Sequence, residues 1–368
     1  MDLDNAVLPR PKLSFACPPG GRSVEHSRIA ESLGYERVWL FDSPSMYTDI
    51  WVSLARIADA TERIGLGTGV AVPSMRHPMV TASAIAAVEE LAPGRLVVAF
   101  GTGFTARLTM GQKPMRWSEL VEYTRQVRAL LDGAVVQIDG GACQMMHVDD
   151  LAPQRPIRVP HWVAPSGPKG MRAARDLGVE GVLVISPPDE PLDCAHRGLL
   201  VFGTVIRPGE DETSSRVLAA VGPSYTTTVH GLWDVAPALL SSIPGGQEWH
   251  ARVNADRPDG ERHLIVHRGH LSSVTDRDRD LVHAAGNTIL GTGWTGDAAS
   301  IAARLDEAAG RGITEILYIP AGPDVPAELE AFSKAAQLWS PMCTGWPQIR
   351  RGRWLVKLAP QGKTTVFS

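Results

Sequence analysis

The sequence has little cysteine and no hydrophobic run of membrane-spanning length. Its 368 residues include four cysteines, at positions 17, 143, 194 and 343, and none of them forms a Cys-x-x-Cys pair. This scatter argues against a disulfide framework or a zinc finger and is typical of reduced thiols. No apolar run approaches the roughly 18 residues of a membrane span, and the first residues lack a signal-peptide core. We therefore expect a cytoplasmic protein that does not enter a membrane.

The chain also lacks an excess of charge. Its formal net charge is -4, with 21% charged and 44% hydrophobic residues. Such a balance gives no electrostatic reason to expect nucleic acid or an anionic membrane surface as a partner. The apolar fraction is that of a well-packed globular protein, and the length suits one elaborated α/β barrel or two ordinary domains.

Short apolar runs alternate with segments of helical spacing. Because the runs do not alternate polar and apolar residues, they predict parallel strands covered by helices. Eight such strands close a (β/α)8 TIM barrel, and the alternative is a doubly wound open sheet. A hairpin is expected at Ala134–Met146. The eight expected strands are Lys12–Cys17, Arg37–Asp42, Ile64–Val72, Arg95–Gly103, His161–Pro165, Glu180–Ile185, Gly198–Ile206 and Ile313–Pro320.

A long Pro-, Gly- and His-rich stretch, about 207–295, interrupts this alternation before the last strand. We expect residues 1–340 to form a single barrel domain with that insertion, and 341–368 to be a C-terminal extension of uncertain order. The insertion carries bulky side chains that would either line an apolar substrate pocket or form the insertion's own small core. They are Trp233, Leu239, Leu240 and Trp249.

In such a barrel the chemistry lies where the strands end, at their carboxyl edge. Asp42 ends the second strand, where it could serve a site or only cap the next loop. Glycines at 65, 67 and 69 in the third strand indicate either a flat ring close to the backbone or tight packing and a bulge. His77 precedes Pro78 at a helix start, so we interpret it as a structural residue rather than a base.

Two glycine patterns resemble dinucleotide-binding motifs. Gly101–Ala106 matches G-x-G-x-x-A, and Gly291–Gly296 matches G-x-G-x-x-G. The first is followed by a turn-rich segment, with a helix expected only from about Ser118, and the second follows no convincing strand. Because the motif requires a strand, a turn and a helix in direct succession, we do not expect a Rossmann site.

The fifth strand end combines Ser166, Gly167, Pro168 and Lys169 just before a helix. Free backbone N–H groups at a helix start attract anions, and a lysine beside them adds positive charge. A plain helix cap would account for the Ser-Gly-Pro part alone. The lysine and the position at a strand end favour phosphate binding.

Three histidines lie close together at 263, 267 and 270. Their spacing would suit a metal on one helix face. However, the run Leu264–Val266 favours a strand, in which 263 and 267 share a face and 270 opposes them. With no acidic or thiol ligand nearby in sequence, we favour pocket-lining or structural histidines and expect no metal.

Taken together, these strand ends resemble the bacterial luciferase-like superfamily, and most of all its deazaflavin-using branch, which includes methylenetetrahydromethanopterin reductase. The resemblance lies in the segments AESLGYERVWLFDS, IGLGTGVAVPSMRHPMVTASAIAAVEELAPGRLVVAFGTG, SGPK and GITEILYIPAGPD. It covers most of 30–178 and 296–324.

The resemblance implies a cofactor, coenzyme F420 or alternatively FMN, at the carboxyl end of the barrel. It implies a cis peptide between Gly69 and Val70, with Asp42 and the turn at Thr102 and Gly103 near the ring system. It further implies that Ser166, Gly167, Pro168 and Lys169 hold the cofactor phosphate. A homodimer is implied as well.

The sequence departs from the pattern of the superfamily's glucose-6-phosphate dehydrogenases. Ser43 and Gly103 stand where those enzymes carry a histidine and a glutamate, and Ala16 stands near the reductase's acid. Val72 stands where relatives often have asparagine. No catalytic acid carries over, so sugar-phosphate oxidation is not expected.

The leading hypothesis is an oxidoreductase that transfers a hydride between a bound deazaflavin and a small, apolar organic substrate. Asp42, His77, His267 or a bound water are the candidate proton donors. One alternative is an FMN-dependent monooxygenase supplied by a separate reductase. Another is a barrel that binds a cofactor or ligand without catalysis.

Overall fold

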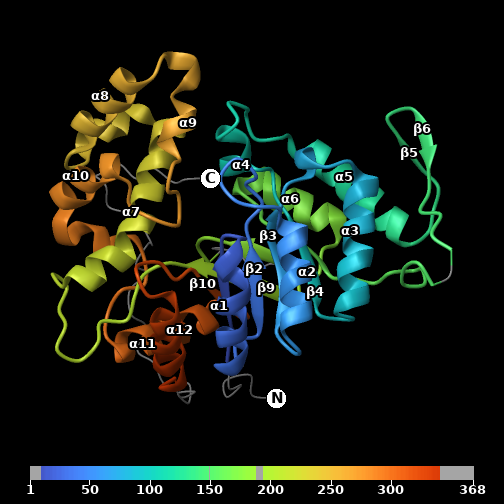
Figure 1. Cartoon of the computed structure of the whole chain (residues 1–368), viewed down its shortest axis with the longest axis horizontal. Helices are drawn as coiled ribbons and strands as arrows, with labels where there is room; N and C mark the ends of the chain where they lie inside the picture. The colour runs from blue at the N-terminus through green and yellow to red at the C-terminus, as the bar shows by residue number, and fades with distance from the viewer. Residues whose placement is uncertain (1–9, 149, 188–193, 340–368) are drawn as a thin grey trace, which may run out of the picture. The chain divides into compact units, whose positions relative to one another are not determined.

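The computed structural model describes residues 10–148, 150–187 and 194–339. Eight strands form a closed barrel in the order β1-β10-β9-β8-β7-β4-β3-β2 (Figure 1). The closed order excludes an open doubly wound sheet and confirms the predicted (β/α)8 TIM barrel. The barrel strands are β1 Lys12–Cys17, β2 Arg37–Leu40, β3 Gly65–Ala71, β4 Leu96–Phe100, β7 His161–Val163, β8 Gly181–Val184, β9 His196–Val201 and β10 Glu315–Tyr318.

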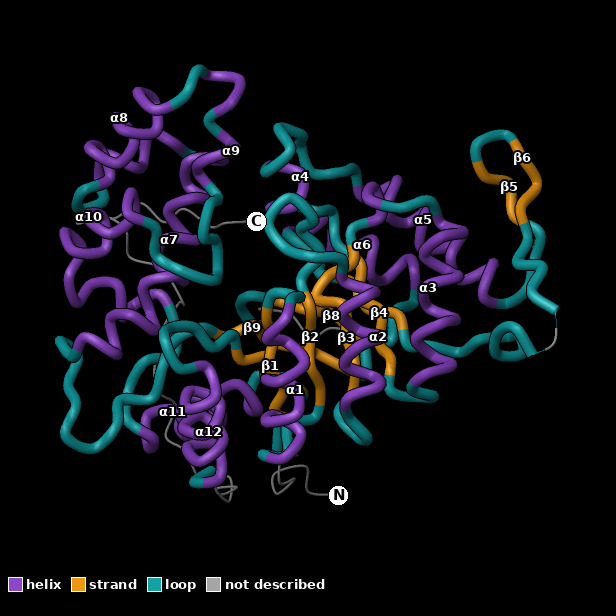
Figure 2. The backbone as a smooth tube through the Cα atoms, in the orientation of Figure 1, coloured by secondary structure: helices purple, strands orange, loops and turns teal. Residues whose placement is uncertain are grey.

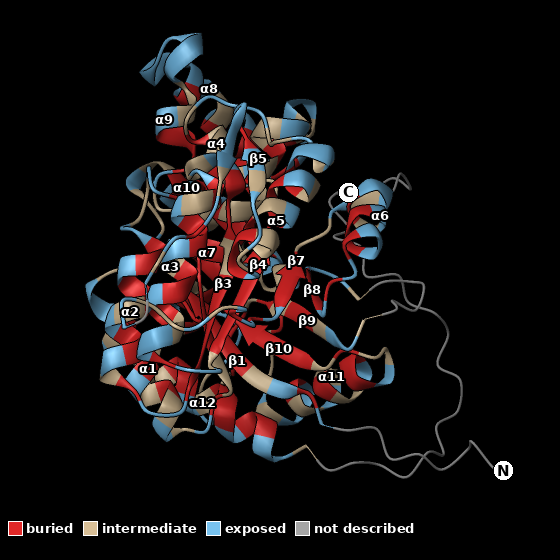
Figure 3. Cartoon of the chain, turned by 90° about the vertical axis from the view of Figure 1, so that its right-hand side faces the viewer, coloured by how far each residue is buried: buried red, intermediate tan, exposed pale blue. Residues whose placement is uncertain are grey.

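The described chain divides into two compact units. Most of the barrel strands lie in the first unit, residues 13–184 and 192–198. Strands β4 and β8 are buried along their whole length (Figure 3). This burial is why their sequences are continuous apolar runs rather than alternating ones. The helices of this unit are α1 Gly21–Ser32, α2 Ile50–Ala60, α3 Pro78–Leu91, α4 Phe104–Leu108, α5 Trp117–Leu131 and α6 Gly167–Leu177.

A hairpin of β5 (Val136–Ile138) and β6 (Gly141–Cys143) follows α5. It forms a separate two-stranded sheet outside the barrel (Figure 2) and is held to α5 by a hydrogen bond from Gln126 Nε2 to the Gln137 carbonyl at 3.3 Å. The hairpin predicted at Ala134–Met146 is therefore confirmed.

Two tryptophans meet inside this part of the barrel. The ring centroids of Trp39 and Trp162 lie 5.1 Å apart. A Cβ added to Gly67 would lie 2.4 Å from the Trp39 ring, and one added to Gly181 would lie 2.4 Å from the Trp162 ring. Gly67 is thus explained by tight packing, the alternative to a bound ring that the sequence left open.

The second unit comprises, among the described residues, 10–12, 185–187 and 199–339. Most of the segment expected as an insertion is helical (Figure 2). The α-helices are α7 Ser215–Val235, α8 Gly246–Asp256, α9 His263–Val266, α10 Asp276–Ala285, α11 Ala298–Gly310 and α12 Val325–Gln337. Four short 3-10 helices also occur in the described chain: η1 Pro73–Met75, η2 Pro237–Ser242, η3 Asp259–Glu261 and η4 Gly286–Thr292.

The bulky residues of this segment pack on one another. Leu240 and Trp249 belong to a buried apolar cluster of α7, α8 and α10, and Trp233 and Leu239 pack against it. The sequence left two roles open for these side chains, lining a substrate pocket or forming a small core. The structure shows the small core. The reason for expecting an apolar substrate is thereby removed.

Two local predictions were wrong. Leu264–Val266 belongs to the one-turn helix α9 rather than to a strand, because packing among helices overrides the weak β preference of Ile and Val. The short helix α4 begins directly after Gly103, where the sequence predicted no helix before about Ser118. The predicted extension at 341–368 lies outside the described residues, and no described helix is long and apolar enough to cross a membrane.

Candidate functional site

The end of β3 carries a bulge. Gly69 pairs with Ala99 and Ala71 pairs with Phe100, so Val70 is an extra residue in the ladder between β3 and β4. The Gly69–Val70 peptide is cis, as the family resemblance implied. A Cβ added to Gly69 would lie 3.1 Å from Cβ of Trp39. The glycine therefore combines close packing with the irregular backbone of the bulge.

The two glycines that follow β4 accommodate the valines of this bulged strand end. A Cβ on Gly101 would lie 2.5 Å from Cγ2 of Val70. A Cβ on Gly103, whose φ is 77°, would lie 2.5 Å from Cγ1 of Val72. The G-x-G pattern is thus accounted for by packing within the barrel. Between these glycines, the carbonyl of Thr102 accepts a hydrogen bond from the Met115 N–H at 3.0 Å.

Asp42 lies at the centre of a polar group beside β3. Its Oδ2 accepts hydrogen bonds from the Val72 N–H at 3.0 Å and from Nη1 of Arg76 at 2.8 Å. The other arm of the guanidinium, Nη2, lies 2.6 Å from Oδ2 of Asp49, the N-cap of α2. Asp42 therefore fixes the end of the neighbouring strand rather than only capping its own loop.

Burial sets the electrostatics of this group. The Asp42 side chain is 2% exposed and the Arg76 side chain 14%. Burial raises the pKa of Asp42, and the Arg76 guanidinium and the Val72 N–H partly offset that rise. Burial lowers the pKa of Arg76, but the two carboxylates outweigh it, so the net pKa of Arg76 is raised. The pair is held as an ion pair with one carboxylate oxygen, Oδ1, free of hydrogen bonds to the described residues.

Arg76 is a residue that the sequence analysis did not single out. It follows the third strand in the segment PSMRHP, next to His77. The available sequence signal was the position of this arginine, a cation between the end of a strand and the start of a helix. Its two carboxylate partners, Asp42 and Asp49, both lie in the segment that follows β2, and sequence spacing does not predict their contact with Arg76.

His77 is the N-cap of α3. Its Nδ1 accepts a hydrogen bond from the Met79 N–H at 3.1 Å, and its Nε2 lies 3.8 Å from Oδ2 of Asp139. The sequence predicted a structural residue here, and the role observed is that of a helix cap. His77 and Arg76 also line an open depression of about 530 Å³, together with Pro73, Ser74, Pro78, Met115, Ser118, Glu119, Glu122, Tyr123, Gln126, Ile138 and Asp139.

The amino end of α6 presents unpaired polar groups. Ser166 is the N-cap but its hydroxyl makes no capping bond, and Gly167 has a φ of 59°. Pro168, which has no N–H, stands in the first turn, and the Lys169 side chain is exposed with no ion-pair partner among the described residues. The first-turn N–H groups, the hydroxyl and the ammonium therefore remain available to an anion.

Apart from His77 at the start of α3, the predicted site residues fall into three places. Asp42, Gly69 and Val70 lie together with Gly103 around the ends of β3 and β4, within one unit. The residues from Ser166 to Lys169 lie at the start of α6, with no hydrogen bond or ion pair to Asp42. His267 lies in the other unit, beside His270 and Asp234.

Comparison with known proteins agrees with this architecture. Residues 10–315 match the family described as luciferase-like monooxygenase. The chain is 23% identical over 324 residues to a 5,10-methylenetetrahydromethanopterin reductase of Archaeoglobus fulgidus, covering 83% of this chain and 92% of the relative. It is 32% identical over 174 residues to an F420-dependent hydroxymycolic acid dehydrogenase of Mycobacterium tuberculosis, covering 43% of this chain and 47% of the relative. The chain therefore spans about half the length of some of its curated relatives.

Among solved structures, the fold is similar to that of the coenzyme F420 dependent tetrahydromethanopterin reductase from Methanopyrus kandleri. The TM-score is 0.62 at 18% identity, covering 89% of this chain and 98% of the other. The family match extends over most of the described residues and includes both units. The chain belongs to the luciferase-like monooxygenase family.

Proposed function

We propose that the protein is an oxidoreductase that binds coenzyme F420 and transfers a hydride between this coenzyme and a small organic substrate. The observation that carries the proposal is the amino end of α6, whose hydroxyl, ammonium and N–H groups are unpaired at the carboxyl end of a barrel strand. A phosphorylated cofactor fits such a group of donors. Relatives whose names include F420 dependence support this choice of cofactor.

The chain's own residues would have distinct roles. Ser166, Gly167 and Lys169 would bind the phosphate, with Pro168 shaping the turn. Gly69, Val70, Thr102 and Gly103 would border the ring system, and the free Oδ1 of Asp42 would face it. When bound, the coenzyme supplies the hydride acceptor or donor, and the protein contributes position and exclusion of water.

His77 is the proton donor that we favour. Because its Nδ1 accepts from the Met79 N–H, the neutral ring carries its proton on Nε2. Asp42 is held as an anion by Arg76, which suits accepting or orienting a proton better than donating one. We leave His267 out of this proposal because its ring is enclosed by two other imidazoles and a carboxylate.

The decisive experiment is a parallel titration of the cofactor-free protein with F420 and with FMN, followed by fluorescence. We expect binding of F420 and weaker or no binding of FMN. Binding of FMN alone would favour the monooxygenase alternative, which the family description keeps open. Binding of F420 without hydride transfer to any organic substrate would favour a non-catalytic barrel. By the same family resemblance we expect a cytoplasmic homodimer.

A further inference from the structure

Three imidazoles converge in the helical unit. His230 comes from α7, and His267 and His270 come from the turn that follows α9. All three are buried, with exposed fractions of 0%, 2% and 6%. His263, which the sequence grouped with the last two, is not part of this cluster. The sequence indicated that His267 and His270 are near each other, but it did not indicate that His230 joins them.

Their nitrogen atoms lie at separations that suit a shared metal ion. Nδ1 of His270 is 3.4 Å from Nδ1 of His230 and 3.4 Å from Nδ1 of His267. One ring nitrogen from each residue lies within 4.8 Å of the others. Two nitrogens bound tetrahedrally to one Zn²⁺ at about 2.0–2.1 Å stand about 3.3–3.4 Å apart. Two of the three contacts already have that separation.

Carboxylates lie on the far side of two of the rings. Nε2 of His267 is 3.0 Å from Oδ2 of Asp234, and Nε2 of His230 is 3.5 Å from Oδ1 of Asp278. Neither Nε2 has a hydrogen-bond partner among the described residues, so these carboxylates act on the rings through their proximity and negative charge. Metal-binding histidines commonly have a carboxylate on this side of the ring, which orients the ring and increases its basicity.

Two nitrogens compete for one partner at the centre of the cluster. Nδ1 of His230 and Nδ1 of His267 both contact Nδ1 of His270, which offers either one proton or one lone pair. A single well-directed hydrogen bond therefore satisfies only one of the two contacts. A cation at the centre would satisfy all three nitrogens together.

The charges around the cluster also suit a dication. Asp278 is anchored by bonds to its carboxylate from the Trp249 indole N–H at 2.8 Å and the Thr275 hydroxyl at 2.5 Å. Asp234 is also buried, its side chain 3% exposed. The negative charge of two buried carboxylates would be balanced by one divalent ion.

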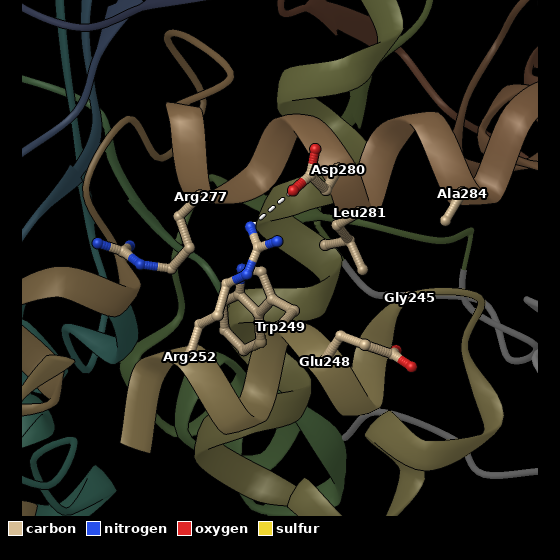
Figure 4. A pocket seen from close by; sticks show the side chains of 8 residues that line it. All are labelled: Gly245, Glu248, Trp249, Arg252, Arg277, Asp280, Leu281 and Ala284. Carbon is tan, nitrogen blue, oxygen red and sulfur yellow. Dashed lines mark ion pairs between the residues drawn. The ribbon is translucent and has the colours of Figure 1, made fainter. Parts of the chain in front are cut away.

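A pocket lies near the cluster. It has a volume of about 320 Å³ and is lined by Trp249, Arg252, Arg277 and Asp280, together with Gly245, Glu248, Leu281 and Ala284 (Figure 4). The Trp249 ring also stacks on His230, with ring centroids 5.9 Å apart. Arg252 pairs with Asp280 at 2.7 Å. Trp249 therefore connects the lining of this pocket with the histidine cluster.

We propose that His230, His267 and His270 bind one transition-metal ion, with Zn²⁺ the favoured occupant and a water in the fourth position. Donors that are all imidazole nitrogens select zinc, copper, nickel or iron over magnesium and calcium. The ion would link α7 to the turn after α9 and so stabilise the helical unit. The proposal does not depend on which cofactor the barrel binds.

The test uses tag-free full-length protein, stripped with a chelator and then titrated with Co²⁺ and Zn²⁺. Co²⁺ should give the visible absorption bands of a tetrahedral nitrogen site, saturating at one ion per chain. Zn²⁺ should abolish those bands and raise the midpoint of thermal unfolding by roughly 3–4 °C when it is 100-fold above its dissociation constant.

The matched variants are His270→Gln, which removes a ligand, and His263→Gln, which changes the neighbouring histidine outside the cluster. His263→Gln should keep the Co²⁺ bands and the thermal shift, and His270→Gln should lose both. If His270→Gln does not fold, the Co²⁺ titration of the wild type and of His263→Gln still decides the question. Absence of tetrahedral bands in the wild type, or equal metal binding by His270→Gln, would overturn the proposal.

Discussion

Nη1 of Arg76 lies 2.8 Å from Oδ2 of Asp42, and this pair joins the end of the second strand to the segment after the third. The same carboxylate oxygen accepts the backbone N–H of Val72. One buried charge is therefore balanced by one cation and one amide. The geometry at the end of β3 depends on this balance, and so do the residues proposed to border the cofactor.

Arg76→Met should lower the free energy of unfolding by about 3–5 kcal/mol, because it leaves Asp42 buried without its cation. Adding Asp42→Asn should recover part of the loss, since the unpaired charge is then removed. Denaturant unfolding measures both effects. Arg63→Met is the control, because Arg63 forms an exposed ion pair with Glu62 and its loss should cost about 1 kcal/mol or less. An additive double variant would contradict the proposed coupling.

Replacing Ser166 and Lys169 together by alanine should weaken F420 binding by about 1–3 kcal/mol if they bind the phosphate through charge-assisted bonds. Arg175→Ala removes the same charge from the last turn of the same helix and should leave the affinity unchanged. Fluorescence titration reports both dissociation constants. Equal affinities for the double variant and the wild type would reject this phosphate site.

Gly101→Ala should destabilise the protein by about 1–3 kcal/mol, because the new methyl group would lie 2.5 Å from Cγ2 of Val70. Val70→Ala removes that methyl and should restore part of the loss in the double variant. Gly21→Ala is the control, because a Cβ at Gly21 meets nothing within 4 Å. Thermal unfolding of the four variants measures the effect. If Gly101→Ala leaves the unfolding midpoint unchanged, the bulge can shift to accommodate the methyl group and the predicted clash is wrong.

Acid should destabilise the protein through His161. Burial lowers the pKa of this histidine to about 3, and the ring stacks on Phe100 in the barrel wall. Below pH 6.5, the ordinary pKa of histidine, His161 is protonated in the unfolded chain. In the folded chain it is protonated only below about pH 3. The free energy of unfolding should therefore fall between pH 6.5 and pH 3, by roughly a few kcal/mol from this group.

His161→Phe should flatten that part of the pH profile while keeping an aromatic ring against Phe100. His283→Gln, on the exposed side of α10, should leave the profile as in the wild type. Denaturant unfolding at several pH values provides the comparison. An unchanged slope in His161→Phe would assign the acid sensitivity to other groups.

Cys17 should resist alkylation in the folded protein. It is 5% exposed, and burial raises the pKa of its thiol to about 12, so almost no thiolate forms at pH 8. Cys143, which is only partly buried, is the internal control and should react with iodoacetamide under the same conditions. Peptide mass spectrometry before and after denaturation compares the two. Equal labelling of both thiols in the native protein would contradict the packing of β1.

The strands could be predicted from the sequence because each is a short, continuous apolar run with its own boundaries. The hairpin after α5 and the His77 cap are equally local signals, carried by a few neighbouring residues. The cis peptide at Gly69–Val70 came instead from the family resemblance. The strands, the hairpin and the cap share one property: the residues that determine each of them are adjacent in the chain.

The features that were missed depend on contacts between distant residues. Arg76 meets carboxylates 27 and 34 positions away, and His230 meets His270 across 40 positions. No local pattern encodes such pairs before the fold is known. The helix α9 was missed for a related reason, because a four-residue turn takes its conformation from the helices that surround it.

The apolar cluster of α7, α8 and α10 shields its own side chains from water. A segment that has its own hydrophobic core can accept substitutions on its exposed face without changing the packing of the preceding strands. Variation among natural homologues should therefore accumulate at different rates in the two parts.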